Sequence, residues 1–186
     1  MKVWSLISSA LLSCASIASA VAVAPVTNKC AKVNILFIGL PAYHPHVISQ
    51  GYDPAVVDQG LKQQLQALVA AGYNTKEVWF GPEEVIDPLL ESLRERKWDG
   101  IIIGFGIRGD PGLEATIHLE EIIAGLQAEA KKIKIMFNRS PITNIEAVTR
   151  NFGLTGCENK PGINYGEHIY CAPEVCSTAP PGWLPN

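Results

Sequence analysis

Four short apolar runs, each followed by a stretch with helical periodicity, constrain the fold of this chain more than any other feature. The runs are rich in branched residues and too short for helices, so they are predicted to be buried strands. They cover 32–39, 73–80, 101–105 and 132–138. Strand–helix units repeated in this way imply parallel strands joined by right-handed crossovers, with helices on both faces of the sheet.

The fold class predicted from this alternation is α/β, with three layers and a four-stranded parallel sheet. The first and third runs are the most apolar and belong in the middle, which favours the flavodoxin-like strand order 2-1-3-4. The second run is less apolar and is expected nearer an edge. The segment 163–172 is a weaker candidate for a short additional edge strand.

The stretches between the runs carry signals for the ends of helices. Asp53-Pro54 and Asp87-Pro88 each combine an N-cap residue with proline in the first turn. Gly72 is a typical residue at a helix stop. The expected helices cover 54–71, 88–97, about 112–130, and a fourth from Ser140 or Thr143 to near 152.

The chain is expected to divide into four segments of different character. Residues 1–20 have the layout of a secretory signal peptide, with an apolar run and the small-residue cleavage pattern Ala18-Ser19-Ala20. A lead-in at 21–31 then precedes the α/β domain at 32–152. A Cys-, Gly- and Pro-rich C-terminal extension covers 153–186.

Secretion is favoured over two alternatives for the first segment. A retained transmembrane anchor needs about 20 strongly apolar residues, whereas this run is diluted by Ser and Ala. A bacterial lipoprotein box at Cys14 is poorly matched, because Leu12 does not suit that motif. We therefore expect a secreted, extracellular protein with no stable insertion into a membrane.

The cysteines support an oxidising compartment. Cys14 would leave with the signal peptide, and the even set that remains is typical of disulfides. The fourth helix is expected to end beside the start of the first strand, which favours the pairs Cys30–Cys157 and Cys171–Cys176. A zinc site that includes His168 is the alternative, but the chain has no C-x-x-C pair.

Charge and composition exclude some classes of partner. The net charge is −3, with Lys and Arg interspersed among Asp and Glu. Nucleic-acid-binding proteins and polybasic membrane-binding segments need a clustered basic patch, which this sequence lacks. We therefore expect no nucleic-acid partner, and the sequence defines no protein partner.

In an open parallel sheet, ligands bind beyond the carboxyl ends of the strands, at the point where the strand order reverses. For the order 2-1-3-4 this point lies between the first and third strands. Polar and titratable side chains follow both strands and the fourth one. They are His44 and His46, then Arg108 and Asp110 with Gly106 and Gly109, and finally Asn138, Arg139 and Ser140.

Gly104, Gly106 and Gly109 form a G-x-G-x-x-G match, but a dinucleotide site is not expected. The match follows the third strand rather than the first. Asp110-Pro111 comes next, so a carboxylate occupies the helix start and proline removes one amide donor. The glycines are better explained by tight turns and close packing, and we expect no cofactor.

Arg108 is the strongest candidate for binding a ligand. An arginine presented by a glycine-rich loop can hold a carboxylate or phosphate through two hydrogen bonds. The alternative is a local ion pair with Asp110 or Glu114. Arg139 is a second candidate, with simple exposure to solvent as its alternative.

His44 and His46 are candidates for acid/base chemistry or for a metal pair. In an extended segment, side chains two residues apart point the same way and two imidazoles can share one ion. A third ligand would have to come from Asp110 or His118. Solvent-exposed histidines are the favoured interpretation, and no metal site is predicted.

Ser140 and Asn138 each have competing explanations. Ser140 is the best-placed hydroxyl, yet Ser-Pro at a helix start is first of all an N-cap, and no G-x-S-x-G motif is present. Asn138-Arg139-Ser140 is a glycosylation sequon weakened by Pro141. A glycan on Asn138 would crowd the expected ligand site.

The segments I-I-I-G-F-G-I-R-G at 101–109 and I-M-F-N-R-S-P at 135–141 resemble a group of small, uncharacterised flavodoxin-like α/β proteins of fungi and bacteria. The resemblance covers about 33–152 and includes the helices around Leu119-Glu120 and at 145–150. It implies the fold but no activity, because none is assigned to that group. The first segment and the cysteine-rich tail resemble additions typical of secreted fungal proteins.

Two functional hypotheses follow. In the first, a secreted domain binds a small anionic molecule at the carboxyl ends of strands one, three and four, through Arg108 and its neighbours. His44 or His46 would then serve as an acid/base group, and whether the protein is an enzyme is left open. In the second, the protein is a non-catalytic interaction or effector-like module, and the same side chains are only caps and turns.

Overall fold

A computed structural model describes residues 29–130 and 132–184 of the chain, so the expected signal peptide lies outside the described residues. The strands and helices alternate along the chain as the sequence predicts. The strands are β1 Val33–Gly39, β2 Tyr73–Phe80, β3 Gly100–Ile103, β4 Lys134–Phe137 and β5 Asn164–Tyr170. The helices are α1 Pro45–Ser49, α2 Pro54–Ala70, α3 Asp87–Glu95, α4 Phe105–Arg108, α5 Leu113–Glu129 and α6 Asn144–Thr149.

The strands form one parallel sheet in the order β4-β3-β1-β2-β5. The first four strands therefore have the predicted order 2-1-3-4, and the α/β class is confirmed. The predicted number of four strands is wrong, because the weaker candidate at 163–172 forms β5, which pairs with β2 as a fifth strand. This strand comes from the Cys- and Gly-rich segment and has only exposed and half-buried residues, so its apolar signal is weak.

The prediction that β2 lies nearer an edge is wrong for the same reason. Pairing with β1 on one side and β5 on the other buries all eight residues of β2. Lys76 and Glu77 are among them, with exposed fractions of 2% and 3%. Lys76 forms an ion pair with Glu95 of α3, which compensates its burial.

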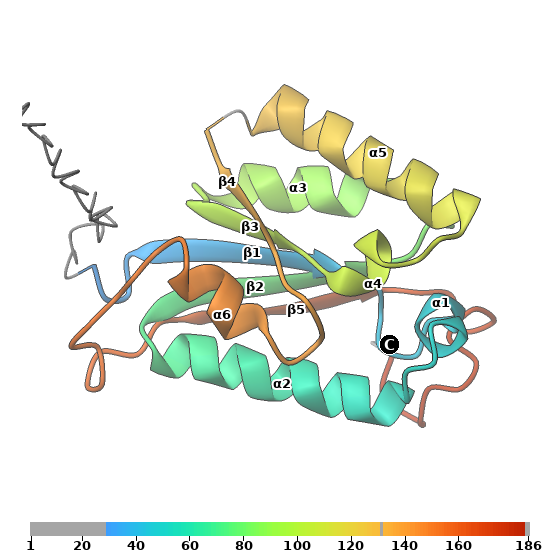
Figure 1. The fold of residues 1–186 in the computed structure, drawn as a ribbon, viewed down its shortest axis with the longest axis horizontal. Helices are drawn as coiled ribbons and strands as arrows, with labels where there is room; N and C mark the ends of the chain where they lie inside the picture. The colour runs from blue at the N-terminus through green and yellow to red at the C-terminus, as the bar shows by residue number, and fades with distance from the viewer. Residues whose placement is uncertain (1–28, 131, 185–186) are drawn as a thin grey trace, which may run out of the picture.

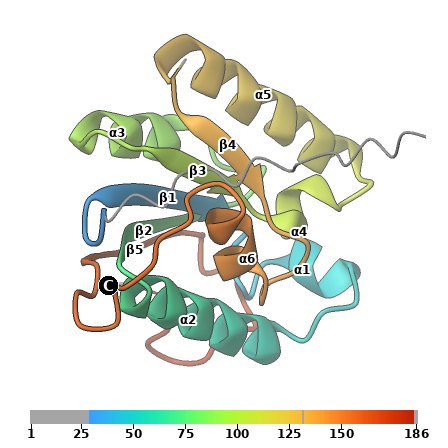
Figure 2. The ribbon, with the colours of Figure 1, turned by 60° about the vertical axis from the view of Figure 1, so that its left-hand side comes forward.

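The helices cover both faces of the sheet. Helices α3 and α5 lie on one face, and α2 and α6 lie on the other (Figures 1 and 2). The branched residues of β1 and β3 are almost fully buried and form the centre of the core. No helix among the described residues is long and apolar enough to span a membrane.

Several element ends differ from the predictions because local contacts replace the expected caps. The third strand ends at Ile103, and Phe105 begins the short helix α4 rather than ending the strand. Ile86 rather than Asp87 is the N-cap of α3. Neither Ser140 nor the Thr143 hydroxyl caps α6, because that hydroxyl accepts hydrogen bonds from the backbone of Arg139 and Ser140 instead.

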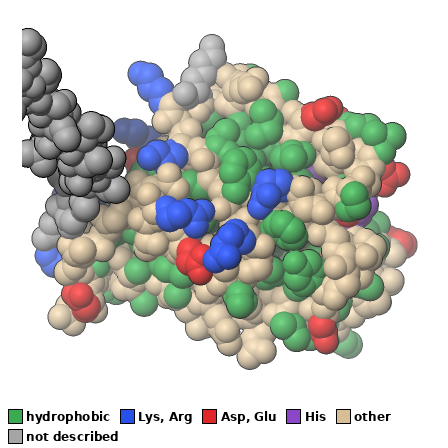
Figure 3. All heavy atoms as spheres, in the orientation of Figure 1, with side chains coloured by type: hydrophobic (Ala, Val, Ile, Leu, Met, Phe, Trp, Pro, Cys, Tyr) green, Lys and Arg blue, Asp and Glu red, His purple; other side chains and the backbone are tan. Residues whose placement is uncertain are grey.

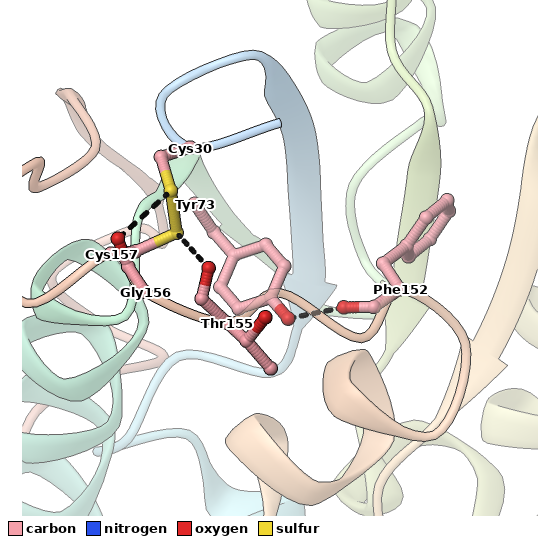
Figure 4. The surroundings of a disulfide bond; sticks show 6 residues. All are labelled: Cys30, Tyr73, Phe152, Thr155, Gly156 and Cys157. Atoms are coloured by element: carbon pink, nitrogen blue, oxygen red, sulfur yellow. Dashed lines mark hydrogen bonds between the residues drawn. A yellow bond between two sulfur atoms is a disulfide. The ribbon is translucent and has the colours of Figure 1, made fainter. Parts of the chain in front are cut away.

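Both predicted disulfides are confirmed. Cys30 bonds to Cys157, and Cys171 bonds to Cys176. The first bridge joins the segment before β1 to the segment after α6. It lies beside Tyr73, whose hydroxyl donates to the Phe152 carbonyl (Figure 4). Gly72 permits this arrangement, since it has a φ of +91° and an added Cβ would lie 2.9 Å from Cβ of Cys157.

Candidate functional site

A small cavity lies at the carboxyl ends of β1 and β3, where the strand order reverses. We call it the chamber. About 40 Å³ of it is open to water-sized molecules. Its lining is mainly apolar and comes from the ends of the two strands, from α2 and from the loops that follow. The lining includes Phe37, Leu40, Val47, Tyr52, Val57, Leu61, Trp79, Phe105, Asn138 and Pro141.

Two shallower hollows adjoin the chamber. A polar groove of about 510 Å³ is lined by Ser49, Gln50 and the turn from Gly109 to Gly112. An apolar groove of about 180 Å³ is lined by Val56 and by the segment from Ser140 to Ile142. Tyr52 lines the chamber and both grooves, so the three hollows adjoin at this residue.

The sequence did not single out Tyr52 or Gln50. Both lie in the segment 40–52, in which only His44 and His46 stand out from the sequence. In the structure this segment contains α1, and Gln50 donates from Nε2 to the carbonyls of His46 and Gly106, each at 2.9 Å. This role of Gln50 could not be predicted from the sequence, because it depends on the proximity of α1 and α4 in space.

Asn138 lines the chamber, and its side chain is held by three hydrogen bonds. It is 2% exposed. Its Oδ1 accepts from the Phe105 amide at 2.7 Å, and its Nδ2 donates to the Ser140 carbonyl and to Oδ1 of Asn144 at 3.0 and 2.6 Å. A glycan replaces one hydrogen of Nδ2, so its attachment in the folded protein would break at least one of these two bonds.

Arg108 is exposed and lines none of the three hollows, but it contacts Phe105 and Asn138, which line the chamber. Its guanidinium donates to the Asn138 carbonyl at 2.7 Å and stands 5.1 Å from the ring centre of Phe105 and 5.5 Å from that of Phe137. Among the described residues it forms no ion pair with Asp110 or Glu114, so the local alternative is not what holds it. Guanidinium has five donors, and most of them remain available to a ligand.

Arg139 behaves differently. Its Nη2 donates to Oε2 of Glu146 at 2.6 Å, and both side chains are largely exposed. This pairing occupies its charge with a neighbouring carboxylate. Of the two arginines, Arg108 is therefore the one whose charge is not already balanced.

Gly106 of α4, Gly109 at its C-cap and Ser140 each pack against or bond to other parts of the fold. An added Cβ on Gly109 would lie 2.5 Å from the Phe105 ring, and one on Gly106 would lie 3.3 Å from Leu40. Both glycines thus permit close packing, as the sequence suggested. Ser140 lines the apolar groove, and its amide donates to Oγ1 of Thr143 at 3.0 Å.

His44 is 2% exposed, so the expectation of a solvent-exposed histidine is wrong for this residue. It is the N-cap of α1, and its Nδ1 accepts the backbone N–H of His46 at 3.2 Å. In the neutral ring the proton must then be on Nε2, which donates to Oε2 of Glu83 at 2.9 Å. Burial, the largest single effect, would raise the pKa of Glu83, but the bond from His44, a backbone hydrogen bond and the charges of His44 and His118 together lower it.

His46 forms a second histidine–carboxylate pair. Its Nδ1 lies 2.6 Å from Oδ2 of Asp110, and its Nε2 lies 3.8 Å from Oε2 of Glu114. Asp110 also accepts the Gly112 amide at 2.7 Å. Burial would raise the pKa of Asp110, but the bonds from Gly112 and His46 lower it. The carboxylate holds the proton on Nδ1, which leaves Nε2 of His46 as a base.

The predicted extended geometry of His44 and His46 is wrong, because α1 begins between them. Their rings are stacked instead, with centroids 5.2 Å apart. His118 of α5 does not join them as a third ligand. Within the described parts of the chain, no group of three or more His, Cys, Asp or Glu side chains has a geometry that could hold a metal ion.

His118 is the most unusual titratable group near these pairs. It is 1% exposed, packs edge-on against Phe80, and neither ring nitrogen has a hydrogen-bond partner among the described residues. Its pKa is lowered from 6.5 to about 4, mainly by burial. The charges of His44 and His46 contribute to this shift, and Glu83 opposes it. His118 is therefore neutral at pH 7.

Comparison with known protein families, with curated proteins and with solved structures gives no match to this chain. The fold and the site define an all-parallel α/β protein with two disulfides. The chamber and the two grooves adjoin at the switch point of its sheet. Function must be argued from that site alone.

Proposed function

We propose that the protein binds a small molecule with an apolar body and an anionic group at the carboxyl ends of β1, β3 and β4. The observation that carries this proposal is the chamber, an apolar cavity at the position where open α/β sheets bind their ligands. The two grooves that meet it at Tyr52 give a bound molecule room to extend beyond the chamber.

The size of the hollows limits the ligand. Typical small-molecule pockets enclose roughly 300–1,000 Å³, whereas the chamber offers about 40 Å³. The chamber alone therefore accepts only a small apolar group, and the rest of the ligand would lie in the open grooves. A dinucleotide does not fit this description.

Arg108 would hold the anionic group. It is exposed and lies outside the lining of the hollows, but it packs against Phe105, which lines both the chamber and the polar groove. Charge-assisted hydrogen bonds from arginine to a carboxylate or phosphate are among the strongest in proteins. The bond to the Asn138 carbonyl orients the guanidinium before any ligand arrives.

His46 would supply an acid/base group if the bound molecule reacts. Asp110 fixes its tautomer, and Asp110 itself lines the polar groove. This pair supports a catalytic role but does not define a reaction, because no activated hydroxyl or thiol accompanies it among the described residues. The proposal is therefore for binding, with catalysis as its extension.

We also propose that the protein is a secreted, flavodoxin-like member of the group that its sequence resembles. Disulfides form and persist in oxidising compartments outside the cytosol. The confirmed pairs Cys30–Cys157 and Cys171–Cys176 support this part. Mass spectrometry of the protein recovered from the culture medium of its native source would detect a chain beginning at Val21. Recovery of a chain that retains residues 1–20 inside cells would contradict it.

A second candidate function is a non-catalytic module that binds another protein through the edge strand β4. Ile135 and Phe137 of this strand are 37% and 41% exposed. Lys and Arg side chains gather beside apolar ones on the face where β4 and α6 lie toward the viewer (Figure 3). A partner segment with acidic and apolar side chains would fit this face.

A titration with small carboxylates tests the proposed function. We expect isothermal titration calorimetry to show binding of at least one compound from a panel such as benzoate, phenylacetate and hexanoate. Arg108→Gln should weaken that binding about tenfold or more, because a charge-assisted pair is lost. Arg139→Gln is the matched control, since this arginine is already paired with Glu146, and it should change binding less than about twofold.

The same titration can contradict the proposal. If Arg108→Gln binds every compound as the wild-type protein does, Arg108 does not hold the anion. If no carboxylate or phosphate compound binds, the anionic class is wrong. Binding of an acidic, apolar peptide that Ile135→Lys abolishes would favour the second candidate.

A further inference from the structure

Helix α1 covers part of the chamber. Val47 is its buried residue, with an exposed fraction of 5%, and lines the chamber. A helix of five residues cannot hold its place by its own hydrogen bonds, because isolated helices this short are unstable in water. Its position therefore depends on its contacts with the rest of the protein.

Two histidine–carboxylate pairs hold the N-terminal end of α1. His44 bonds to Glu83, which lies in the connection between β2 and α3. His46 bonds to Asp110, which lies in the turn between α4 and α5. The anchors therefore come from two separate connections at the same end of the sheet.

The charged groups that face these pairs can all be named. His44 and His46 face each other as stacked rings. From α5, Glu114 faces His46 at 3.8 Å and His118 interacts with both histidines and with Glu83. With Asp110, these are three imidazoles and three carboxylates.

We propose that α1 is a lid over the chamber, which the two histidine–carboxylate pairs keep closed and which acid releases. The inference rests on the proposed function, because the chamber is the site that the lid would open. It adds regulation of access to that site, and it does not depend on the identity of the ligand.

The sign of the pH response follows from the charges. Each pair is a charge-assisted hydrogen bond as long as its carboxylate is ionised. The lowered pKa values of Glu83 and Asp110 keep both carboxylates ionised below the range of ordinary acids. Mild acid therefore leaves both pairs in place.

Stronger acid has the opposite effect. Once Glu83 and Asp110 become neutral, His44 and His46 lose their carboxylate partners. His118 gains its own proton in the same range, because burial lowers its pKa to about 4. A buried positive charge then lies beside the two histidines without an ionised Glu83 to oppose it. Both changes release α1.

Hydrogen exchange measured on the full chain without ligand tests this inference. The amides of Val47, Gly51 and Tyr52 are bonded within the lid segment, so they report its opening. After correction for intrinsic exchange, we expect their protection to fall about tenfold or more between about pH 5 and about pH 3, the range in which the two carboxylates become neutral and His118 gains its proton. The amides of β3 should keep their protection over the same range.

Variants sharpen the measurement. The double variant Glu83→Gln, Asp110→Asn removes both ionisable anchors, so the lid should be poorly protected at both pH values. Glu84→Gln is the matched control, because this neighbouring carboxylate forms no ion pair or hydrogen bond among the described residues, and it should behave as wild type. The inference is overturned if lid protection does not fall between about pH 5 and about pH 3, if β3 loses protection together with the lid, or if the double variant keeps the wild-type pH response.

Failure of the lid and failure of the proposed function can be told apart. A lid that opens as described in a protein that binds no carboxylate or phosphate would contradict the ligand proposal only. A carboxylate that binds with the expected dependence on Arg108, to a protein whose α1 amides do not respond to pH, would contradict the lid only.

Discussion

Nδ1 of His46 lies 2.6 Å from Oδ2 of Asp110, and this contact joins α1 to the turn before α5. The same carboxylate accepts the Gly112 amide at 2.7 Å. In the sequence, Asp110 is the residue that argues against a dinucleotide site, because it occupies the amides at a helix start. In the structure it does occupy one of them, and it also orients a histidine beside the polar groove.

The first prediction concerns this pair. Asp110→Asn removes the charge from two hydrogen bonds of a side chain that is only 6% exposed. We expect a loss of about 2 kcal/mol in the free energy of unfolding at pH 6, measured with urea, because bonds to charged groups contribute more than neutral ones. Asp87→Asn is the control on an exposed helix start, and it should change stability by less than about 0.5 kcal/mol. Equal effects of the two substitutions would contradict the role given to Asp110.

The second prediction concerns the pH dependence that His118 confers. Its pKa is lowered from 6.5 to about 4 in the folded protein, so the unfolded chain binds more protons between these values. Stability should therefore be full above pH 6.5 and fall as the pH drops toward 4, by at most about 3 kcal/mol. His118→Phe should remove this part of the pH dependence, while the exposed His168→Gln should keep it. Urea unfolding at pH 7, 5.5 and 4.5 measures the difference, and parallel curves for wild type and His118→Phe would contradict it.

The third prediction concerns Glu77, whose pKa is raised well above 4.5 by burial and by the neighbouring carboxylates Glu167 and Asp58. The folded protein then binds more protons than the unfolded chain above pH 4.5. This contribution to stability is present at low pH and is lost as the pH rises through the folded pKa. Glu77→Gln cannot ionise, so relative to wild type its stability should improve as the pH rises. A stability difference that does not change with pH would show that Glu77 is not a buried, protonated acid.

The fourth prediction compares the disulfides. Cys30–Cys157 closes a separation of 127 residues and Cys171–Cys176 one of 5. In the loop-entropy model, replacing both cysteines of the first pair by Ala should cost about 5 kcal/mol and of the second pair about 2 kcal/mol. Urea unfolding of the two double variants measures the order, and a larger loss for the short bridge would contradict it.

The sequence predicted the fold where the signals are local and strong. The apolar runs of β1 and β3 and the Asp53-Pro54 start of α2 appear as expected, and so does the order of the first four strands. The fifth strand is only a weak candidate in the sequence. Its residues are half buried or exposed, and its pairing with β2 depends on contacts far apart in the chain. The burial of β2 followed from the same pairing.

The sequence predicts where the switch point of the sheet lies, but not how the side chains around it are arranged. The switch point is a property of topology, so it could be located once the strand order was known. The burial of His44, its bond to Glu83 and the stacking on His46 depend on α1, a helix too short to leave a periodic pattern. Tyr52 is identified as a candidate site residue only from the structure, in which it lines all three hollows.

The central claim is that the hollows around Tyr52 bind a small molecule that carries an anionic group. A ¹⁵N–¹H NMR titration with the carboxylate panel tests it most directly, because each amide reports its own surroundings. The account predicts that at least one compound shifts the amides of Gln50, Tyr52 and Gly106 at concentrations that leave Ile135 and Phe137 unchanged. Shifts confined to β4, or no shift at Tyr52 with any compound, would contradict it.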